Sequence, residues 1–161
     1  MLSRAAQAAW IDPSSGPRRR AESLPGGGRR RRDGESRVTY LWVAAGGALG
    51  SVARVWLTLA VTAYTGPRFP WATLLINIGG SLVIGWFGAL TGAGGRIGVS
   101  AEMRAFVMAG LCGGFTTFSA FSAQALELLR EGEVGRAAGY ILGSVVLCLL
   151  AVWAGFALGR V

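Results

Sequence analysis

Residues 110–122 read GLCGGFTTFSAFS, and this glycine- and threonine-rich stretch lies inside an otherwise apolar segment. Paired glycines and paired threonines weaken an α-helix, because glycine adds backbone freedom and threonine loses side-chain freedom there. The surrounding segment, residues 105–126, carries no charged side chain and is long enough to cross a bilayer, which takes about 20 apolar residues. The sequence therefore predicts a membrane-spanning helix that is broken near its middle.

Three further apolar segments flank this one, at residues 40–65, 71–92 and 137–159. Only Arg54 interrupts the first, and the other two contain no charge. Short connections rich in glycine and proline separate the segments, as expected for turns between helices. The chain is 52% hydrophobic and only 15% charged. We therefore predict an all-α membrane protein whose four transmembrane helices form one domain at residues 38–161.

Residues 1–37 differ sharply in composition from this domain. They hold nine of the 16 basic residues, all arginine, together with three prolines and a triple glycine. Such a composition is typical of a disordered, solvated tail. The alternative is a tail that binds anionic lipid headgroups or nucleic acid. Because we favour the disordered tail, we expect no nucleic-acid partner for the protein.

The arginines outside the tail do not favour one membrane orientation. Three lie in connections on one side and three on the other, so by the positive-inside rule this domain could insert either way. The tail arginines favour a cytoplasmic N-terminus. The two groups are Arg96, Arg104 and Arg160, against Arg68, Arg130 and Arg136.

The composition also excludes most enzyme chemistry. The chain has no histidine, and no acidic residue lies deep in an apolar segment. A zinc site, a haem site and a hydrolytic triad all need such side chains. The two cysteines lie in apolar stretches, where thiols usually pack as small hydrophobes. We therefore expect no catalytic residues and no enzyme activity.

Polar side chains at membrane depth are costly unless they have partners or face water. One polar face is expected on the helix at 71–92, another on the helix at 137–159, and a pair of phenylalanines follows the predicted break. Hydroxyls can also donate to carbonyls of their own helix, and aromatic pairs often only pack. These residues are therefore either pore-lining or purely structural. Amide and hydroxyl donors with phenyl edges, and no carboxylate, favour a path for a small, hard anion. The residues are Thr73, Asn77 and Ser81; Tyr140, Ser144 and Cys148; Thr117, Phe118, Phe121 and Ser122.

Three motifs within 38–161 resemble the signatures of the Fluc/CrcB fluoride channels. They are GGALGSVAR at 46–54, TLLINIGGS at 73–81 and GGFTTFSAFS at 113–122, in that order. The resemblance implies a fluoride-specific channel in the plasma membrane that passively exports fluoride from the cytoplasm and so reduces its toxicity. It also implies an antiparallel, dual-topology homodimer with two pores.

Residue roles follow from the same resemblance. Phe118 and Phe121 would line the fluoride pore, Asn77 would turn its amide toward the ion, and Arg54 would either attract anions at a vestibule or anchor the fold. Backbone carbonyls near Gly113 and Thr116 would bind a structural sodium ion. Tyr140 and Ser144 match the family's polar track, and Thr73 and Ser122 complete the set of pore candidates. Cys148 departs from the hydroxyl expected there, and a thiol is a weaker donor.

The sequence leaves alternatives open for the function and for the assembly. One is a structural or regulatory membrane protein that acts through the arginine-rich tail at residues 1–37. A small dual-topology drug or cation antiporter also has four helices, but it needs a carboxylate embedded in the membrane. A homodimer inserted in both orientations would have to export the arginine tail of one copy. A heterodimer with an oppositely oriented homologue would avoid that step, as would a true start near Arg37.

Overall fold

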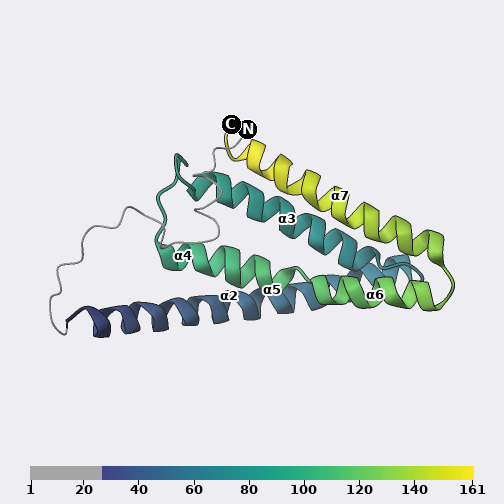
Figure 1. Cartoon of the computed structure of the whole chain (residues 1–161), viewed down its shortest axis with the longest axis horizontal. Coiled ribbons are helices and arrows are strands. Elements are labelled where there is room, and N and C mark those ends of the chain that lie inside the picture. Colours follow the sequence, from purple (N-terminus) through teal and green to yellow (C-terminus); the bar gives the residue numbers. More distant parts are fainter. Residues whose placement is uncertain (1–26) are drawn as a thin grey trace. The chain divides into compact units, whose positions relative to one another are not determined.

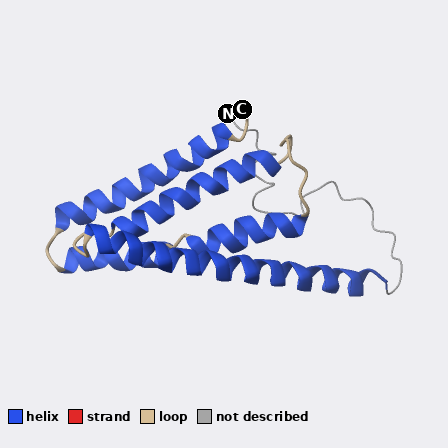
Figure 2. Cartoon of the chain, turned by 180° about the vertical axis from the view of Figure 1, so that it is seen from behind, coloured by secondary structure: helices blue, strands red, loops and turns tan. Residues whose placement is uncertain are grey.

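The computed structural model describes residues 27–161, of which residues 35–161 form one compact unit. Every regular element in this described part is helical (Figures 1 and 2). In chain order the elements are α2 (Gly27–Thr65), α3 (Trp71–Thr91), α4 (Ala101–Ala105), the π-helical segment η1 (Phe106–Cys112), α5 (Gly113–Phe115), α6 (Phe118–Arg130) and α7 (Val134–Leu158).

The predicted four spans are confirmed by length and composition. Within the described residues, four helical stretches are long and apolar enough to cross a membrane: Arg37–Thr65, Trp71–Thr91, Ala101–Arg130 and Val134–Leu158. The fold class is therefore an all-α, multi-pass membrane protein.

Helix α2 begins earlier than the predicted domain boundary at residue 38. It starts at Gly27, and the arginine-rich residues 29–37 contain no proline and continue the helix of the first span. Arginine is a good helix former, so its abundance does not oppose this extension. Residues 1–26 of the predicted disordered tail lie outside the described residues.

The four spans alternate in direction, and α3 and α7 run side by side (Figure 1). Small residues allow this close approach: a side chain at Gly85 would overlap the backbone of Val152, and one at Gly155 would overlap that of Leu82. Close packing between glycine-containing helices is a common solution in membranes, where no hydrophobic effect drives helices together.

Helix α2 packs against the third span in the same way. A Cβ on Gly46 would overlap the carbonyl oxygen of Phe106, and one on Gly50 would overlap that of Leu111. By contrast, Gly135, Gly139 and Gly143 have nothing within 4 Å of their Cβ positions. Gly46 and Gly50 therefore serve contacts within the chain, whereas the three glycines of α7 lie on an open face.

The helical hydrogen-bonding pattern stops between α5 and α6. Thr116 and Thr117 have extended backbone dihedrals, with φ/ψ of −80°/158° and −152°/115°. Thr117 then caps α6, because its hydroxyl accepts a hydrogen bond from the amide N–H of Ala120 at 3.2 Å. These two threonines are the ones that the sequence marked as helix-weakening.

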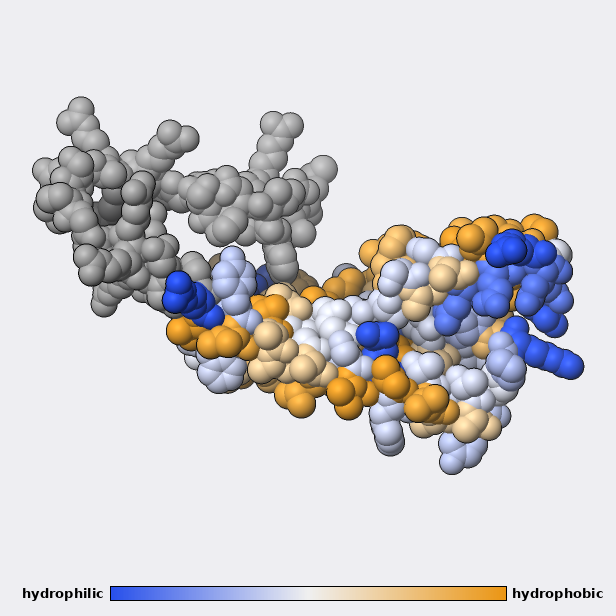
Figure 3. Space-filling view, turned by 90° about the horizontal axis from the view of Figure 1, so that it is seen from below, coloured by the Kyte–Doolittle hydropathy of each residue, from blue (hydrophilic) through white to orange (hydrophobic). Residues whose placement is uncertain are grey.

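Tight turns connect the spans at the positions that the sequence indicates. Gly66 and Gly132 have φ of 73° and 78°, a region that favours glycine because it has no Cβ. In Figure 3, apolar residues recur along the helices, and hydrophilic residues gather at the end where α6 passes into α7. Large apolar side chains such as Trp56, Leu142 and Trp153 are exposed, as expected of surfaces that face lipid or a second subunit.

The buried core lies where α3, α6 and α7 meet. Its members are apolar side chains and one tyrosine: Leu74, Phe121, Ala125, Leu128, Ala137 and Tyr140. This core fixes the start of α6 against α7, and so it positions the polar residues described next.

Candidate functional site

A cavity of about 380 Å³ lies beside the interruption of the third span. Residues of α3, α6 and α7 line it together with the segment around the two threonines. None of these lining residues is acidic or basic. They include four of the predicted pore residues and both predicted sodium-binding positions: Asn77, Phe118, Phe121 and Ser144, with Gly113 and Thr116.

Asn77 bridges the interrupted backbone with both ends of its amide. Its Oδ1 accepts a hydrogen bond from the N–H of Thr117 at 2.9 Å, and its Nδ2 donates to the carbonyl oxygen of Thr117 at 3.2 Å. An amide group carries two N–H donors. One N–H of Asn77 is therefore used to hold the backbone, and the second can donate to a bound anion.

The interruption frees backbone carbonyls from their helical partners. In a continuous helix Gly113 O would accept the N–H of Thr117, but that N–H donates to Asn77. Likewise Thr116 O would accept the N–H of Ala120, but that N–H donates to the Thr117 hydroxyl. Carbonyl oxygens are the hard ligands that alkali cations prefer. The residues therefore fit the sodium site implied by the sequence.

The carbonyl oxygen of Gly114, between these two positions, has side-chain partners in place of a helical one. Arg54 Nε donates to Gly114 O at 3.1 Å, and the Ser51 hydroxyl approaches the same atom at 3.5 Å. Arg54 does not line the 380 Å³ cavity. Of the two roles considered for it, the geometry supports an anchor between α2 and the third span.

Ser144 is the most unusual polar group of the cavity. The residue is 5% exposed, and within the described residues its buried Oγ has no hydrogen-bond partner. A buried hydroxyl without a partner costs free energy, about 1–3 kcal/mol. The position is therefore suited to a ligand that accepts a hydrogen bond.

Aromatic rings continue from the cavity toward the α6–α7 end. The ring centroids of Phe118 and Phe121 are 5.4 Å apart, those of Phe121 and Tyr140 are 5.2 Å apart, and those of Tyr140 and Phe69 are 5.6 Å apart. Tyr140 is 1% exposed and lies behind Phe121, outside the cavity lining, whereas Phe118 is 78% exposed in this chain. Ring edges carry partial positive charge, so the two phenyl rings that line the cavity, Phe118 and Phe121, suit contact with an anion.

Of three further polar residues that the sequence singled out, one lines the cavity and two do not. Cys148 lines the cavity, as the polar-track pattern indicated. Thr73 is buried on α3 but does not line the cavity. Ser122 also lies outside the lining, and its hydroxyl donates to Phe118 O at 2.9 Å within its own helix.

Gln124 is a polar residue that the sequence did not single out. Its Oε1 accepts a hydrogen bond from the Tyr140 hydroxyl at 2.9 Å, which satisfies that buried group. Gln124 follows Phe121 by three positions and so shares its face of α6. That spacing, in an apolar helix, was the signal that could have identified it.

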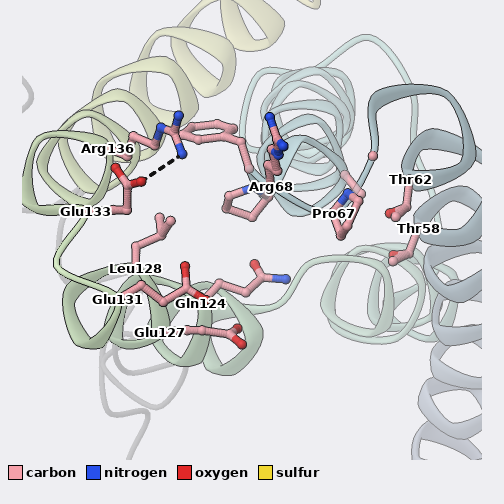
Figure 4. A pocket seen from close by; sticks show the side chains of 14 residues that line it. Thr58, Thr62, Pro67, Arg68, Gln124, Glu127, Leu128, Glu131, Glu133 and Arg136 are labelled. Atoms are coloured by element: carbon pink, nitrogen blue, oxygen red, sulfur yellow. Dashed lines mark hydrogen bonds and ion pairs between the residues drawn. The ribbon is translucent and has the colours of Figure 1, made fainter.

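A second cavity, of about 780 Å³, opens at the α6–α7 end of the molecule (Figure 4). Gln124 and Phe69 line it, and both contact Tyr140, whose ring also contacts Phe121 of the first cavity. Three glutamates and two arginines also line it, and one pair of them forms a salt bridge at 3.2 Å: Glu127, Glu131, Glu133, Arg68 and Arg136, of which Glu133 and Arg136 are paired.

The acidic residues of the compact unit avoid the middle of the spans. Glu35 lies in α2 before the first span, Glu102 in α4 at the start of the third span, Glu127 in the last turn of α6, and Glu131 and Glu133 in the following turn. An antiporter would need a carboxylate deep in the membrane. This placement does not favour the drug or cation antiporter.

Comparison with known proteins agrees with the motifs. The family model for CrcB-like protein, Camphor Resistance (CrcB), matches residues 41–156. The chain is similar to the fluoride-specific ion channel FluC of Methylocella silvestris, with 60% identity over 73% of this chain and 90% of that protein. The FluC proteins of Opitutus terrae and Rhodospirillum rubrum are 56% and 53% identical, over 72% and 73% of this chain and 88% and 92% of their own lengths. With a family match across nearly the whole membrane domain and relatives this similar, the chain belongs to the CrcB family.

Proposed function

We propose that this protein is a fluoride-specific ion channel that passively exports fluoride across the plasma membrane. Its family membership and the names of its relatives support this assignment. The single observation that carries it is the 380 Å³ cavity, which combines the Asn77 amide, the unpartnered Ser144 hydroxyl and two phenyl rings with no carboxylate. A small anion needs hydrogen-bond donors that are not offset by negative charge.

A passive channel is sufficient for this task. Fluoride is the anion of a weak acid, so neutral HF crosses the bilayer and dissociates in a less acidic cytoplasm. The membrane potential then drives the anion outward, with about 2.3 kcal/mol per charge for each 100 mV. The protein needs neither a nucleotide site nor a proton-coupling carboxylate for export.

We further propose that the third span is broken in mid-membrane at Thr116 and Thr117. A structural sodium ion would bind there through the carbonyls of Gly113 and Thr116. When bound, it supplies positive charge that offsets the partial negative charge of the freed carbonyls. The hydrogen bonds from Asn77 on α3 and Arg54 on α2 hold the same segment in place.

The proposed assembly is an antiparallel dimer, as a homodimer or with an oppositely oriented homologue. The balanced arginines of the connections are consistent with insertion in both directions. The 78% exposure of Phe118 also supports a second subunit, because this ring would otherwise leave one side of the cavity open.

Fluoride efflux from liposomes that contain the purified protein tests the function. Liposomes loaded with fluoride or with chloride should show rapid efflux of fluoride only, when a potassium ionophore compensates the charge. Protein-free liposomes give the background rate. Equal efflux of both anions would contradict fluoride specificity, and drug-stimulated proton exchange without fluoride efflux would favour the antiporter.

A further inference from the structure

One layer of side chains separates the two cavities. Phe121 lines the smaller cavity, Phe69 lines the larger one, and Tyr140 contacts both rings. Gln124 lines the larger cavity and fixes the Tyr140 hydroxyl at 2.9 Å. An ion that crossed this layer of side chains from the smaller cavity would therefore enter the larger one.

The larger cavity is strongly charged, unlike the smaller one. Glu127 and Glu131 approach it from the end of α6, and Arg68 approaches from the connection between α2 and α3 (Figure 4). Glu133 and Arg136 neutralise each other at 3.2 Å. The unpaired balance is thus two carboxylates against one guanidinium, an arrangement that opposes the accumulation of anions.

We infer that the 780 Å³ cavity is the mouth of the fluoride pathway, in which Arg68 draws fluoride in and Glu127 holds its local concentration down. This inference rests on the proposed fluoride function and adds rate-determining residues outside the resemblance motifs. Neither side chain touches the small cavity, so each acts through its field on the ion in the mouth. Fields in a cleft can change ion capture substantially, and salt screens them.

Charge-changing and charge-conserving variants at the two positions separate this effect from a structural one. Arg68→Gln removes the cation and Arg68→Lys keeps it; Glu127→Gln removes the anion and Glu127→Asp keeps it. The side chains of Arg68 and Glu127 are both exposed, so the fold should tolerate all four substitutions. Fluoride efflux would be measured at subsaturating fluoride, with sodium held constant and the ionic strength varied by an impermeant salt.

At an ionic strength of about 10 mM, where the Debye length is about 30 Å, the neutral variants should move the rate in opposite directions. Arg68→Gln should slow efflux about threefold and Glu127→Gln should speed it about threefold, as expected for a unit charge a few ångströms from the path. At about 1 M salt, where the Debye length is about 3 Å, both rates should approach wild type. The lysine and aspartate variants should match wild type throughout.

Two results would overturn the inference while leaving the fluoride function intact. One is efflux at the wild-type rate from all four variants at every ionic strength, which would mean that fluoride bypasses this cavity. The other is an effect of the glutamine variants that 1 M salt does not reduce, which would indicate a structural change. If the wild-type protein itself carries no fluoride, the proposed function fails and the mouth inference fails with it.

Discussion

At the scale of single residues, the structure adds a second task for Asn77 to the one that the resemblance predicts. The sequence predicted an amide that faces the ion, and the structure shows the same amide bonded to the N–H and carbonyl of Thr117. Only an amide can accept from one backbone group and donate to the next while it keeps a further N–H. The residue therefore links the backbone interruption to the cavity.

Asn77→Asp should abolish fluoride efflux, with a rate at least about a hundredfold below wild type. A carboxylate can still accept from Thr117 N–H, but it cannot donate to Thr117 O or to an anion, and its charge repels fluoride. Size-exclusion chromatography should show the same oligomer as wild type. Wild-type efflux from this variant would contradict the role given to the Asn77 amide.

Ser144→Ala should slow fluoride efflux about tenfold, because the anion loses a donor worth about 1–2 kcal/mol. Thermal stability should stay the same or rise slightly, since the variant removes a buried hydroxyl without a partner. Ser122→Ala is the matched control: its hydroxyl bonds within its own helix and lies outside the cavity, so the rate should change little. A larger loss at Ser122 than at Ser144 would reverse the assignment.

At the scale of the elements, the contact between α2 and the third span is the feature that holds the site. Glycines bring the two backbones together, and Arg54 then reaches the carbonyl of Gly114 at 3.1 Å. The π-helical segment η1 lies at this contact, and such segments occur frequently at functional sites. The packing of two helices thus fixes the backbone that lines the cavity.

Gly50→Ala should lower the free energy of unfolding by about 1–3 kcal/mol, because the new methyl group would overlap the carbonyl of Leu111. Gly139→Ala makes the same chemical change where nothing lies within 4 Å, and alanine favours the helix there. Thermal unfolding in detergent compares the two variants. Equal stability of both would mean that α2 does not pack as described.

Replacement of sodium by a large organic cation on both sides of the membrane should reduce fluoride efflux or weaken the dimer. The freed carbonyls of Gly113 and Thr116 would then lack the cation that offsets their partial charge. Return of sodium should restore the activity, which controls for irreversible damage. Full activity and an unchanged oligomer after exhaustive sodium removal would argue against a structural cation.

At the scale of the whole molecule, the distribution of charge matches the task of a passive channel. The acidic residues within positions 35–161 lie before the first span, at the ends of the spans or between them, and the 380 Å³ cavity has no charged lining. Transport driven by the membrane potential needs no coupling group in the pathway. The exposed apolar side chains along the helices leave a surface for lipid and a second subunit.

Cells that lack this protein and any other fluoride exporter should fail to grow in fluoride medium, most severely at acidic external pH. Low pH raises the fraction of neutral HF outside, so more fluoride enters and becomes trapped. A copy with Phe118→Ile should rescue growth poorly, because isoleucine has no electropositive ring edge. Phe156→Ile, the same change outside both cavities, should rescue fully. Full rescue by Phe118→Ile would show that this ring only packs.

The sequence by itself determined the number, type and approximate limits of the spans. These properties depend on local composition: apolar length sets a span, and glycine sets the turns at Gly66 and Gly132. The motifs, with the polar track that the resemblance implies, also placed Asn77, Phe118, Phe121 and Ser144 in one candidate site, and the structure gathers them around one cavity.

Only the tertiary structure decided which polar groups are partnered and which are available. Asn77 and Thr117 are 40 residues apart in the chain, and Arg54 and Gly114 are 60 apart, so no local period relates them. The contact of Gln124 with Tyr140, the exclusion of Thr73 and Ser122 from the cavity lining, and the charged second cavity depend on how α3, α6 and α7 pack. Helical periodicity fixes the face on which a side chain lies, but the partner of that face is fixed only when the helices meet.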